Sequence, residues 1–406
     1  MGVNCVDDRK ITLPESVSFI IDRLNSRGFR ADIVGGPVRD HLRGKLPEDY
    51  DVTTNALPEE VEEVFSDIRV IETGIKHGTV TLLIDGVGYE VTTYRIDGEY
   101  KDNRRPESVE FTSDIREDLA RRDFTMNAIA YNPTDGITDP FFGEEDIKRG
   151  VIRAVGDPAL RFSEDALRIL RGIRFSAALG FEIEEATHRA LVDKKELLRN
   201  VSAERIYTEW KKLISGRYAL GVFDNYREVI GVFLPEIKDS PLPEAGAFLS
   251  AEPLVRMLSL FALSGTTGEE YFHAMKRLRT DSRTAENGRC ALENLGKFDL
   301  TATGGLGRLL YLVGEEKAAL TVKLSLLLKI ADQTAPGRLS DYLEERRPYR
   351  LKDLMISGDD LVAIGVRGKE IGRILDELLL RVIDGEAENQ KETLLDLAAK
   401  LISENN

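Results

Sequence analysis

The feature that most constrains the fold is a change of hydrophobic pattern near residues 150–157. Before this point, short runs typical of strands alternate with helical patterns. From Pro158 onward strand signals almost vanish, and apolar residues recur at helical spacing to the C-terminus. A chain of 406 residues is too long for one ordinary domain. The sequence therefore predicts a head of strands and helices followed by an all-helical remainder, with further breaks near residues 216, 264–268 and 335–337.

Local signals within the head predict individual elements. Apolar residues at helical spacing predict a helix over residues 15–27, and residues 29–34 are expected to form a strand. Residues 79–84 and 87–95 are predicted to pair as a hairpin, because the Asp85-Gly86 dipeptide between them suits a tight turn.

The stretch with the most chemical content is residues 34–51, VGGPVRDHLRGKLPEDYD. The pair Gly35-Gly36 lets the backbone approach a ligand closely, and Arg39 follows on a short predicted helix. Asp49 and Asp51 are two residues apart, so an extended chain would project both carboxylates from one face. Such a pair suits Mg²⁺, which binds one or two carboxylates together with substrate phosphates. The combination indicates phosphoryl or nucleotidyl transfer, whereas an Asp-x-Asp sequence alone is also common in solvated turns.

Three further segments of the head add candidates. Glu90 shares a strand face with Thr92, which makes it a candidate third carboxylate; an ordinary surface position is the alternative. Residues 97–106, DGEYKDNRRP, are polar and without periodicity, and they predict a mobile loop. Residues 117–130, EDLARRDFTMNAIA, predict an amphipathic helix with the polar run RRD at residues 121–123.

Residues 162–175, FSEDALRILRGIRF, are predicted to belong to one long helix. Asp165 and Arg168 are three residues apart, and Arg171 and Arg174 follow at the same interval, so all four share one slowly drifting face. The ordinary interpretation of such a row is a salt-bridged surface.

An aspartate beside an arginine can also read a nucleotide base, because a carboxylate only accepts hydrogen bonds and a guanidinium only donates them. Cytosine and adenine present an amino donor beside an acceptor, whereas uracil and guanine do not. Each buried group left unpaired by the wrong base would cost about 1–3 kcal/mol. Such a pair would select C and A without a nucleic-acid template.

Composition limits the other classes of function. Two cysteines cannot build a disulfide framework or a cysteine-rich zinc site, and the four histidines form no HExxH motif. No apolar run is long enough to span a membrane and the N-terminus lacks the apolar core of a signal peptide, so we expect a cytoplasmic protein. The net charge of −15 argues by itself against a nucleic-acid partner, although it does not exclude a local basic groove.

Four motifs in a fixed order resemble those of class II tRNA nucleotidyltransferases, the family of CCA-adding enzymes and bacterial poly(A) polymerases. They are GGPVRD at 35–40, DYD at 49–51, RRDFTMNA at 121–128 and EDALR at 164–168. The resemblance is close over residues 15–215 and weaker beyond, as in IDGEAENQK at 383–391.

This resemblance implies an α+β fold class, with a polymerase-β-like nucleotidyltransferase head (a mixed sheet with helices) followed by an all-helical neck, body and tail. The expected domains are a head with the metal site at 1–152, a neck with the base-reading site at 153–216, a body at 217–335 and a tRNA-binding tail at 336–406.

The resemblance also implies roles for individual residues. Asp49 and Asp51 would bind Mg²⁺, with Glu90 as the third catalytic carboxylate. Gly36, Arg39 and Arg122 would contact the triphosphate of CTP or ATP, and Asp123 would lie near the ribose. The neck residues implied for the base are Asp165 and Arg168, which read it, and Arg171 and Arg174, which support the site.

The implied reaction is the addition of CCA to tRNA 3′ ends, by attack of the tRNA 3′-hydroxyl on the nucleotide α-phosphate with release of pyrophosphate. Residues 97–106 resemble the flexible loop that CC-only members lack, which disfavours CC-only addition. An A-adding enzyme or a poly(A) polymerase is the alternative within the family, and an RNA-binding protein with an inactive head is the alternative outside it. No His-Asp phosphohydrolase motif is intact in the helical half, so no second activity is expected, and no sequence signal indicates an oligomeric state.

Overall fold

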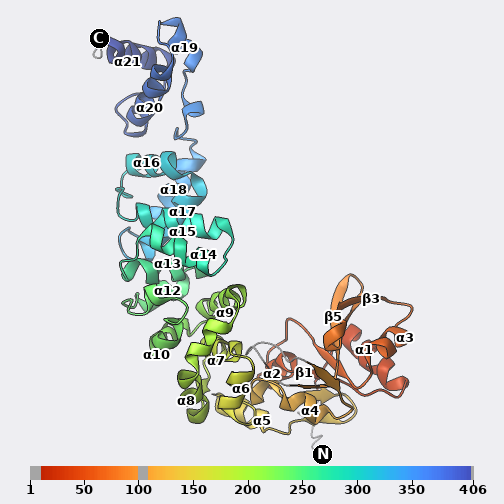
Figure 1. The fold of residues 1–406 in the computed structure, drawn as a ribbon. Coiled ribbons are helices and arrows are strands. Elements are labelled where there is room, and N and C mark those ends of the chain that lie inside the picture. Colours follow the sequence, from red (N-terminus) through yellow and green to blue (C-terminus); the bar gives the residue numbers. More distant parts are fainter. Residues whose placement is uncertain (1–10, 99–107, 404–406) are drawn as a thin grey trace, which may run out of the picture. The chain divides into compact units, whose positions relative to one another are not determined.

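The computed structural model describes residues 11–98 and 108–403. Their contacts divide the chain into two compact units, Met1–Phe233 and Leu234–Asn406 (Figure 1). The predicted loop at residues 97–106 falls, from residue 99 onward, outside the described residues.

The first unit contains the strands and a set of short helices (Figure 1). Its strands are β1 (Ala31–Val34), β2 (Val52–Thr54), β3 (Arg69–Gly74), β4 (Thr79–Ile84), β5 (Val87–Thr93), β6 (Arg95–Asp97), β7 (Val109–Phe111), β8 (Ala130–Asn132), β9 (Gly136–Thr138), β10 (Val151–Ile152) and β11 (Glu182–Ile183). Its α-helices are α1 (Glu15–Ser26), α2 (Gly36–Leu42), α3 (Pro58–Val64), α4 (Ile115–Ala120), α5 (Gly143–Arg149), α6 (Pro158–Glu164), α7 (Leu167–Leu179), α8 (Glu185–Asp193), α9 (Ala203–Ser215), α10 (Ala219–Asn225) and α11 (Arg227–Ile230), with 3₁₀ turns η1 (Ile75–His77), η2 (Thr125–Asn127) and η3 (Lys195–Asn200).

Seven of these strands form one mixed sheet in the order β3-β4-β5-β2-β1-β8-β9. Strands β2 and β5 are parallel neighbours, whereas the other neighbouring pairs are antiparallel. Helix α1 packs against β1 and α3, and it buries Val17, Ile20, Ile21 and Leu24 on one face, as their spacing predicts. The mixed sheet with helices in the head is therefore confirmed.

The hairpin of β4 and β5 also forms as predicted. Asp85 and Gly86 have φ values of 50° and 81°. Positive φ at both central residues is the requirement of the two-residue turn that matches the twist of paired strands.

Two predicted helices are wrong. The helix expected over residues 117–130 ends at Ala120, because the next backbone segment pairs with another one instead of continuing the helix. The amide of Thr125 donates to the carbonyl of Arg153 at 2.9 Å, and the amide of Val155 donates to that of Asp123 at 3.1 Å. The run RRD therefore lies in a turn between α4 and η2.

The helix expected over residues 162–175 is interrupted at Asp165. Helix α6 ends at Glu164, and Asp165 has extended backbone angles, φ −128° and ψ 103°. Its carboxylate accepts a hydrogen bond from the amide of Leu167 at 3.1 Å, at the start of α7. Aspartate competes for backbone amides in this way and so favours helix ends over helix interiors.

The all-helical character expected after residue 157 holds with one exception. Strand β11 lies between α7 and α8 and pairs in parallel with β10. The amides of Glu182 and Glu184 donate to the carbonyls of Gly150 and Ile152, both at 2.9 Å. This short pairing satisfies backbone groups of the chain between the two helices.

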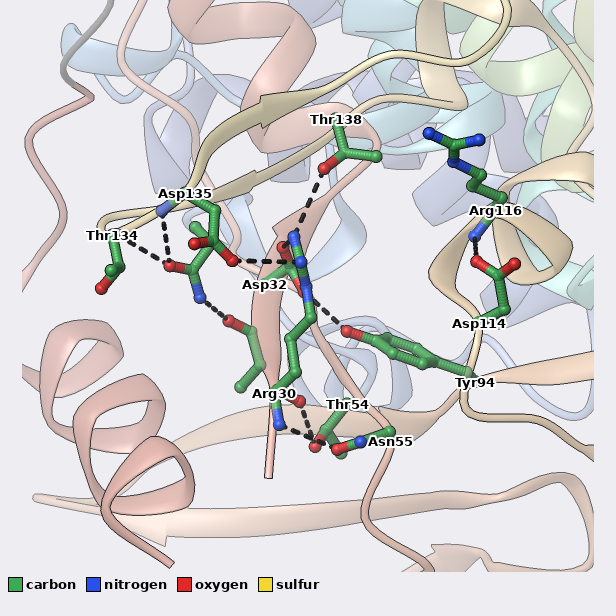
Figure 2. Close-up of polar contacts among 12 residues, drawn as sticks. Arg30, Asp32, Thr54, Asn55, Tyr94, Asp114, Arg116, Thr134, Asp135 and Thr138 are labelled. Carbon is green, nitrogen blue, oxygen red and sulfur yellow. Dashed lines mark hydrogen bonds and ion pairs between the residues drawn. The ribbon is translucent and has the colours of Figure 1, made fainter. Parts of the chain in front are cut away.

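A buried polar network fixes the strand that leads into residues 34–51 (Figure 2). Asp32 on β1 is fully buried, and its carboxylate accepts hydrogen bonds from Arg30 at 2.9 and 3.0 Å and from the Tyr94 hydroxyl at 2.6 Å. Arg30 also contacts Asp135 at 3.1 Å and Thr138 at 3.3 Å, near β9. Burial, together with the charge of Asp32, raises the pKa of Tyr94, and the hydrogen bond to Asp32 raises that of Arg30. The network compensates the cost of a buried carboxylate and joins β1 to its neighbours.

The described residues of the second unit form helices joined by turns and loops, without a strand (Figure 1). Its elements are η4 (Pro235–Ile237), α12 (Ala245–Ser250), α13 (Pro253–Leu263), α14 (Gly268–Arg277), α15 (Ser282–Asn294), α16 (Thr303–Val313), α17 (Glu315–Leu327), α18 (Ala335–Glu344), η5 (Leu351–Asp353), α19 (Gly358–Ala363), α20 (Lys369–Ile383) and α21 (Lys391–Ser403). One apolar cluster joins α16, α17 and α18, and another joins α19, α20 and α21. Across residues 11–98 and 108–403, none of the helices combines the length and the apolar character that crossing a bilayer requires.

Candidate active site

The glycine pair forms a turn between β1 and α2. Gly35 has φ 76°, and its amide donates to the carbonyl of Ile129 at 3.1 Å. A Cβ atom at Gly35 would lie 3.2 Å from Nη1 of Arg122, closer than ordinary contact. Gly35 therefore needs to be glycine both for its backbone angles and for the approach of an arginine. Gly36, the predicted phosphate contact, is the first residue of α2.

The two carboxylates of the DYD motif lie at the end of β1 and the start of β2. The carbonyl of Asp51 accepts a hydrogen bond from the amide of Val34 at 3.2 Å, so Asp51 stands beside the glycine turn. Asp49 and Asp51 are both exposed, and among the described residues neither side chain forms a hydrogen bond or an ion pair. Their oxygens keep lone pairs free for a ligand, and oxygen donors are what Mg²⁺ prefers.

The electrostatic surroundings of Asp51 connect it to the arginine at the glycine turn. Although the residue keeps contact with solvent, desolvation of its carboxyl group raises the pKa of Asp51. Arg122 opposes this rise, and the like charge of Asp49 adds to it. A divalent cation would relieve the repulsion between the two carboxylates, so this donor set fits the metal that the motif predicts.

Glu90 lies one strand away from Asp51. The parallel register pairs Val52 of β2 with Val91 of β5, which places Asp51 and Glu90 at neighbouring positions before the paired residues. Glu90 is exposed. In the described part of the chain, however, no three acidic, histidine or cysteine side chains are arranged to hold one metal ion. The role of Glu90 as a third carboxylate stays a prediction.

A contact between His41 and Tyr50, which no sequence pattern indicates, holds the DYD segment against α2. Nε2 of His41 lies 3.0 Å from the hydroxyl of Tyr50, and the two ring centroids are 6.0 Å apart. In an extended segment the middle residue points opposite to its two neighbours. This alternation predicts that Asp49 and Asp51 lie on the face opposite to the Tyr50 ring.

Arg122 is positioned by a buried carboxylate. Asp118 on α4 is fully buried. It forms ion pairs with Arg121 at 2.6 Å and with Arg122 at 3.2 Å. Burial alone would raise the pKa of Asp118, but the two arginines lower it overall. Nε of Arg122 is buried and has no hydrogen-bond partner among the described residues. The Nε donor of Arg122 is therefore an unsatisfied buried group within the described part of the chain.

Arg39 and Asp123 meet through Asn127. Arg39 on α2 donates from Nη1 to the side-chain oxygen of Asn127 at 2.8 Å, and Asn127 donates to Asp123 at 3.1 Å. Asp123 also forms an ion pair of 2.7 Å with Arg171 of α7. Burial alone would raise the pKa of Asp123, but Arg171 and Asn127 lower it to about 2. The carboxylate is therefore ionised at neutral pH, although it is buried.

Three arginines of the predicted site contact the ring of Phe175 on α7. The guanidinium carbons of Arg39, Arg171 and Arg174 lie 5.3, 5.4 and 3.6 Å from its ring centroid. Arg174 also donates to Glu209 of α9 at 2.9 Å. Cations attract the face of an aromatic ring, so Phe175 fixes positive charge contributed by two segments distant in sequence. Its role was not predicted, because a phenylalanine in a helix usually signals only a core position.

The predicted base-reading residues do not pair with each other through their side chains. Asp165 forms an ion pair of 2.9 Å with Arg205 of α9. Arg168 is mostly buried and donates to Glu164 at 2.8 Å and to the carbonyl of Arg121 at 2.7 Å. This last bond ties α7 to the turn that carries Arg122.

Comparison with known proteins identifies the family. Models of the poly A polymerase head domain and of tRNA nucleotidyltransferase domain 2 match residues 31–153 and 257–398, and a model of the RNA- and SrmB-binding site of polymerase A matches 180–239. The chain is 35% identical to a CCA-adding enzyme of Enterococcus faecalis, over 94% of each chain. The chain belongs to the CCA-adding enzyme family. The resemblance drawn from the four motifs is confirmed.

Two further members of the family support the assignment. A CCA-adding enzyme of Geobacillus thermodenitrificans is 36% identical to this chain, over 92% of it and 94% of the relative. The crystal structure of the Bacillus stearothermophilus CCA-adding enzyme in complex with CTP superimposes with a TM-score of 0.81 at 30% identity, covering 97% of this chain and 98% of the other. The likeness thus includes the second unit, where the sequence motifs are weaker.

Proposed function

We propose that this protein adds CCA to the 3′ ends of tRNA from CTP and ATP, without a nucleic-acid template. The observation that carries the proposal is the position of Asp51, which stands beside the glycine turn and interacts electrostatically with the partly unpartnered Arg122. A free carboxylate pair next to a buried arginine suits a metal-bound triphosphate better than a neutral substrate.

The metal would be held by Asp49 and Asp51. Bound there, Mg²⁺ supplies positive charge that activates the attacking hydroxyl and neutralises the leaving pyrophosphate. The contact between His41 and Tyr50 supports this assignment, because it holds the residue that lies between the two carboxylates. In the reaction the tRNA 3′-hydroxyl attacks the α-phosphate of CTP or ATP and pyrophosphate leaves.

The triphosphate would lie along the glycine turn, in contact with Gly36, Arg39 and Arg122. Arginine donors and approachable backbone suit phosphate oxygens. Asp123 would lie near the ribose, where its ionised carboxylate can accept a hydroxyl hydrogen bond.

The base would be read by Asp165 and Arg168 in the neck. Arg171 and Arg174 would support this site from the same helix, since both are stacked near Phe175. The bond from Arg168 to the carbonyl of Arg121 supports a fixed distance between base reading and phosphate binding.

We propose the head at residues 1–152, the neck at 153–216, the body at 217–335 and the tail at 336–406, with body and tail contacting tRNA. The boundary between the compact units, at Phe233 and Leu234, falls within the proposed body. The proposed location is the cytoplasm, where the tRNA substrate is used.

The test is to incubate a tRNA that lacks its CCA end with CTP alone, ATP alone and both, and to sequence the product ends. We expect two cytidines with CTP alone and a complete CCA end with both nucleotides. Incorporation of A without C would indicate an A-adding enzyme or a poly(A) polymerase instead. If neither nucleotide is added in the presence of Mg²⁺, the head is inactive and the proposal is wrong.

A further inference from the structure

The direction of the Asp165 carboxylate is not determined by a helix. Asp165 follows the last residue of α6 and has extended backbone angles. A residue within a helix has its side chain directed by the helix geometry, whereas a residue at a junction requires other contacts. One of these contacts is local, since one carboxylate oxygen accepts a hydrogen bond from the amide of Leu167 at 3.1 Å.

The other contact comes from Arg205 on α9, forty positions further along the chain. Nη2 of Arg205 lies 2.9 Å from the second carboxylate oxygen of Asp165, and the two side chains are 29% and 18% exposed. Partly buried charge-assisted hydrogen bonds of this kind are short and directional. Arg205 thus binds the carboxylate oxygen that the amide of Leu167 does not bind.

A second nitrogen of the Arg205 guanidinium is unsatisfied. Its Nη1 atom is buried and has no hydrogen-bond partner among the described residues. Arg168, in contrast, is engaged by Glu164 and by the carbonyl of Arg121. Of the two arginines, Arg205 is the one in direct contact with the carboxylate that is expected to face the base.

We propose that Arg205 is a positioning residue for nucleotide selection, which holds the Asp165 carboxylate in one orientation. This inference rests on the proposed function of the protein. A fixed acceptor pairs with the amino group of cytosine or adenine and leaves the carbonyl of uracil or guanine unpaired. A carboxylate that can rotate would avoid the mismatched carbonyl, so loss of Arg205 should weaken selection more than it weakens the chemical step.

The experiment measures kcat and KM of purified full-length Arg205→Gln for CTP and for UTP, on a tRNA that lacks its CCA end. We expect the ratio of the two kcat/KM values to fall at least about tenfold, the effect of one buried polar group that no longer penalises the wrong base. Arg205→Lys keeps the charge and one donor, so it should recover part of the selectivity. Arg199→Gln is the matched control, because Arg199 pairs with Glu196 at the surface and should leave the ratio unchanged.

A double-mutant cycle with Asp165→Ala tests whether Arg205 acts through Asp165. We expect Arg205→Gln to lower the CTP-to-UTP ratio no further in the Asp165→Ala background. An additional loss of the same size in that background, or normal selectivity in both Arg205 variants, would overturn the positioning role. Failure of the wild-type protein to add C or A would refute the proposed function itself, which is a separate outcome.

Discussion

Single residues of the same type take opposite electrostatic roles in this site. Asp51 has its pKa raised by desolvation and by Asp49, whereas Asp123 has its pKa lowered to about 2 although it is buried. The difference follows from their neighbours: Asp123 is held by Arg171 and Asn127, and the side chain of Asp51 has no hydrogen-bond partner in the described structure. Asp123 is thus held in place by its partners, whereas the side chain of Asp51 is available to bind a metal ion.

Replacement of Asp51 by asparagine should remove activity without unfolding the protein. The substitution keeps the shape but removes the negative charge expected to hold Mg²⁺, so the rate of C addition should fall at least a hundredfold, or about 3 kcal/mol of transition-state stabilisation. Single-turnover incorporation measures the rate. Asp85→Asn, at the exposed hairpin turn, is the matched control and should retain full activity. Near-normal activity of Asp51→Asn would contradict the metal assignment.

The pairing of Asp123 should make folding stability depend on pH. Because its folded pKa is about 2, below the ordinary 3.8, the stabilisation is fully present above about pH 4 and is lost as the pH falls toward 2. Its size should be about 2 kcal/mol. Urea unfolding of the wild type and of Asp123→Asn at pH 5 and pH 3 measures this contribution. The difference between the two proteins should shrink at pH 3, and a constant difference would argue against the ion pair with Arg171.

At the scale of elements, the site is built where helices and strands stop. The turn after α4 places Arg122 against the glycine turn, and the break between α6 and α7 frees Asp165 from helix geometry. In both places a longer helix was predicted from periodicity. Functional side chains lie at these ends because there the backbone can direct them toward a ligand.

Gly35→Ala should separate backbone strain from site geometry. Gly35 has φ 76° and ψ −121°, a backbone conformation rare for other residues, so alanine there should cost about 1–3 kcal/mol. Its Cβ would also press on Nη1 of Arg122 at 3.2 Å. Gly28→Ala is the control, because Gly28 has φ 87° and no atom within 4 Å of the added Cβ. Both variants should lose stability in thermal unfolding, but only Gly35→Ala should raise the KM for CTP. Equal KM values in the two variants would show that Arg122 is not close to bound nucleotide.

At the scale of the whole molecule, the proposed function requires a protein of net charge −15 to bind tRNA, which is a polyanion. Three cations of the first unit lie close together, because Arg39, Arg171 and Arg174 all contact the ring of Phe175. Local concentration of charge lets an acidic protein attract phosphate at one surface while the rest repels it. Binding to tRNA is therefore expected to rely on a few strong contacts.

The salt dependence of tRNA binding tests this expectation. Each neutralised phosphate contributes a slope of roughly −0.7 to −0.9 in a plot of log affinity against log salt. We expect a slope steeper than about −2, which corresponds to the release of counterions from several phosphates that the protein neutralises. Filter-binding or anisotropy titrations between low and physiological salt give this slope. A slope near zero would mean that phosphate contacts contribute little to tRNA affinity.

Several features of the fold and site could be predicted because they depend on neighbouring residues alone. The hairpin at Asp85-Gly86 requires positive φ at two adjacent positions, and the helix α1 requires apolar residues at helical spacing. The alternation of side chains along an extended chain likewise predicts, from neighbouring residues alone, that Asp49 and Asp51 share one face. Each of the four short motifs can be recognised from neighbouring residues, and their fixed order indicated the family.

The tertiary structure alone decided which charges meet. Nothing local to Asp165 indicates Arg205 as its partner, and nothing local to Phe175 indicates that Arg39 approaches its ring. The helix expected through Asp123 is absent because its backbone bonds to that of Val155, a partner that periodicity cannot reveal. Local sequence determines conformations that neighbouring residues can satisfy by themselves, whereas the pairing of buried charges and backbone groups is settled by segments that only folding brings together.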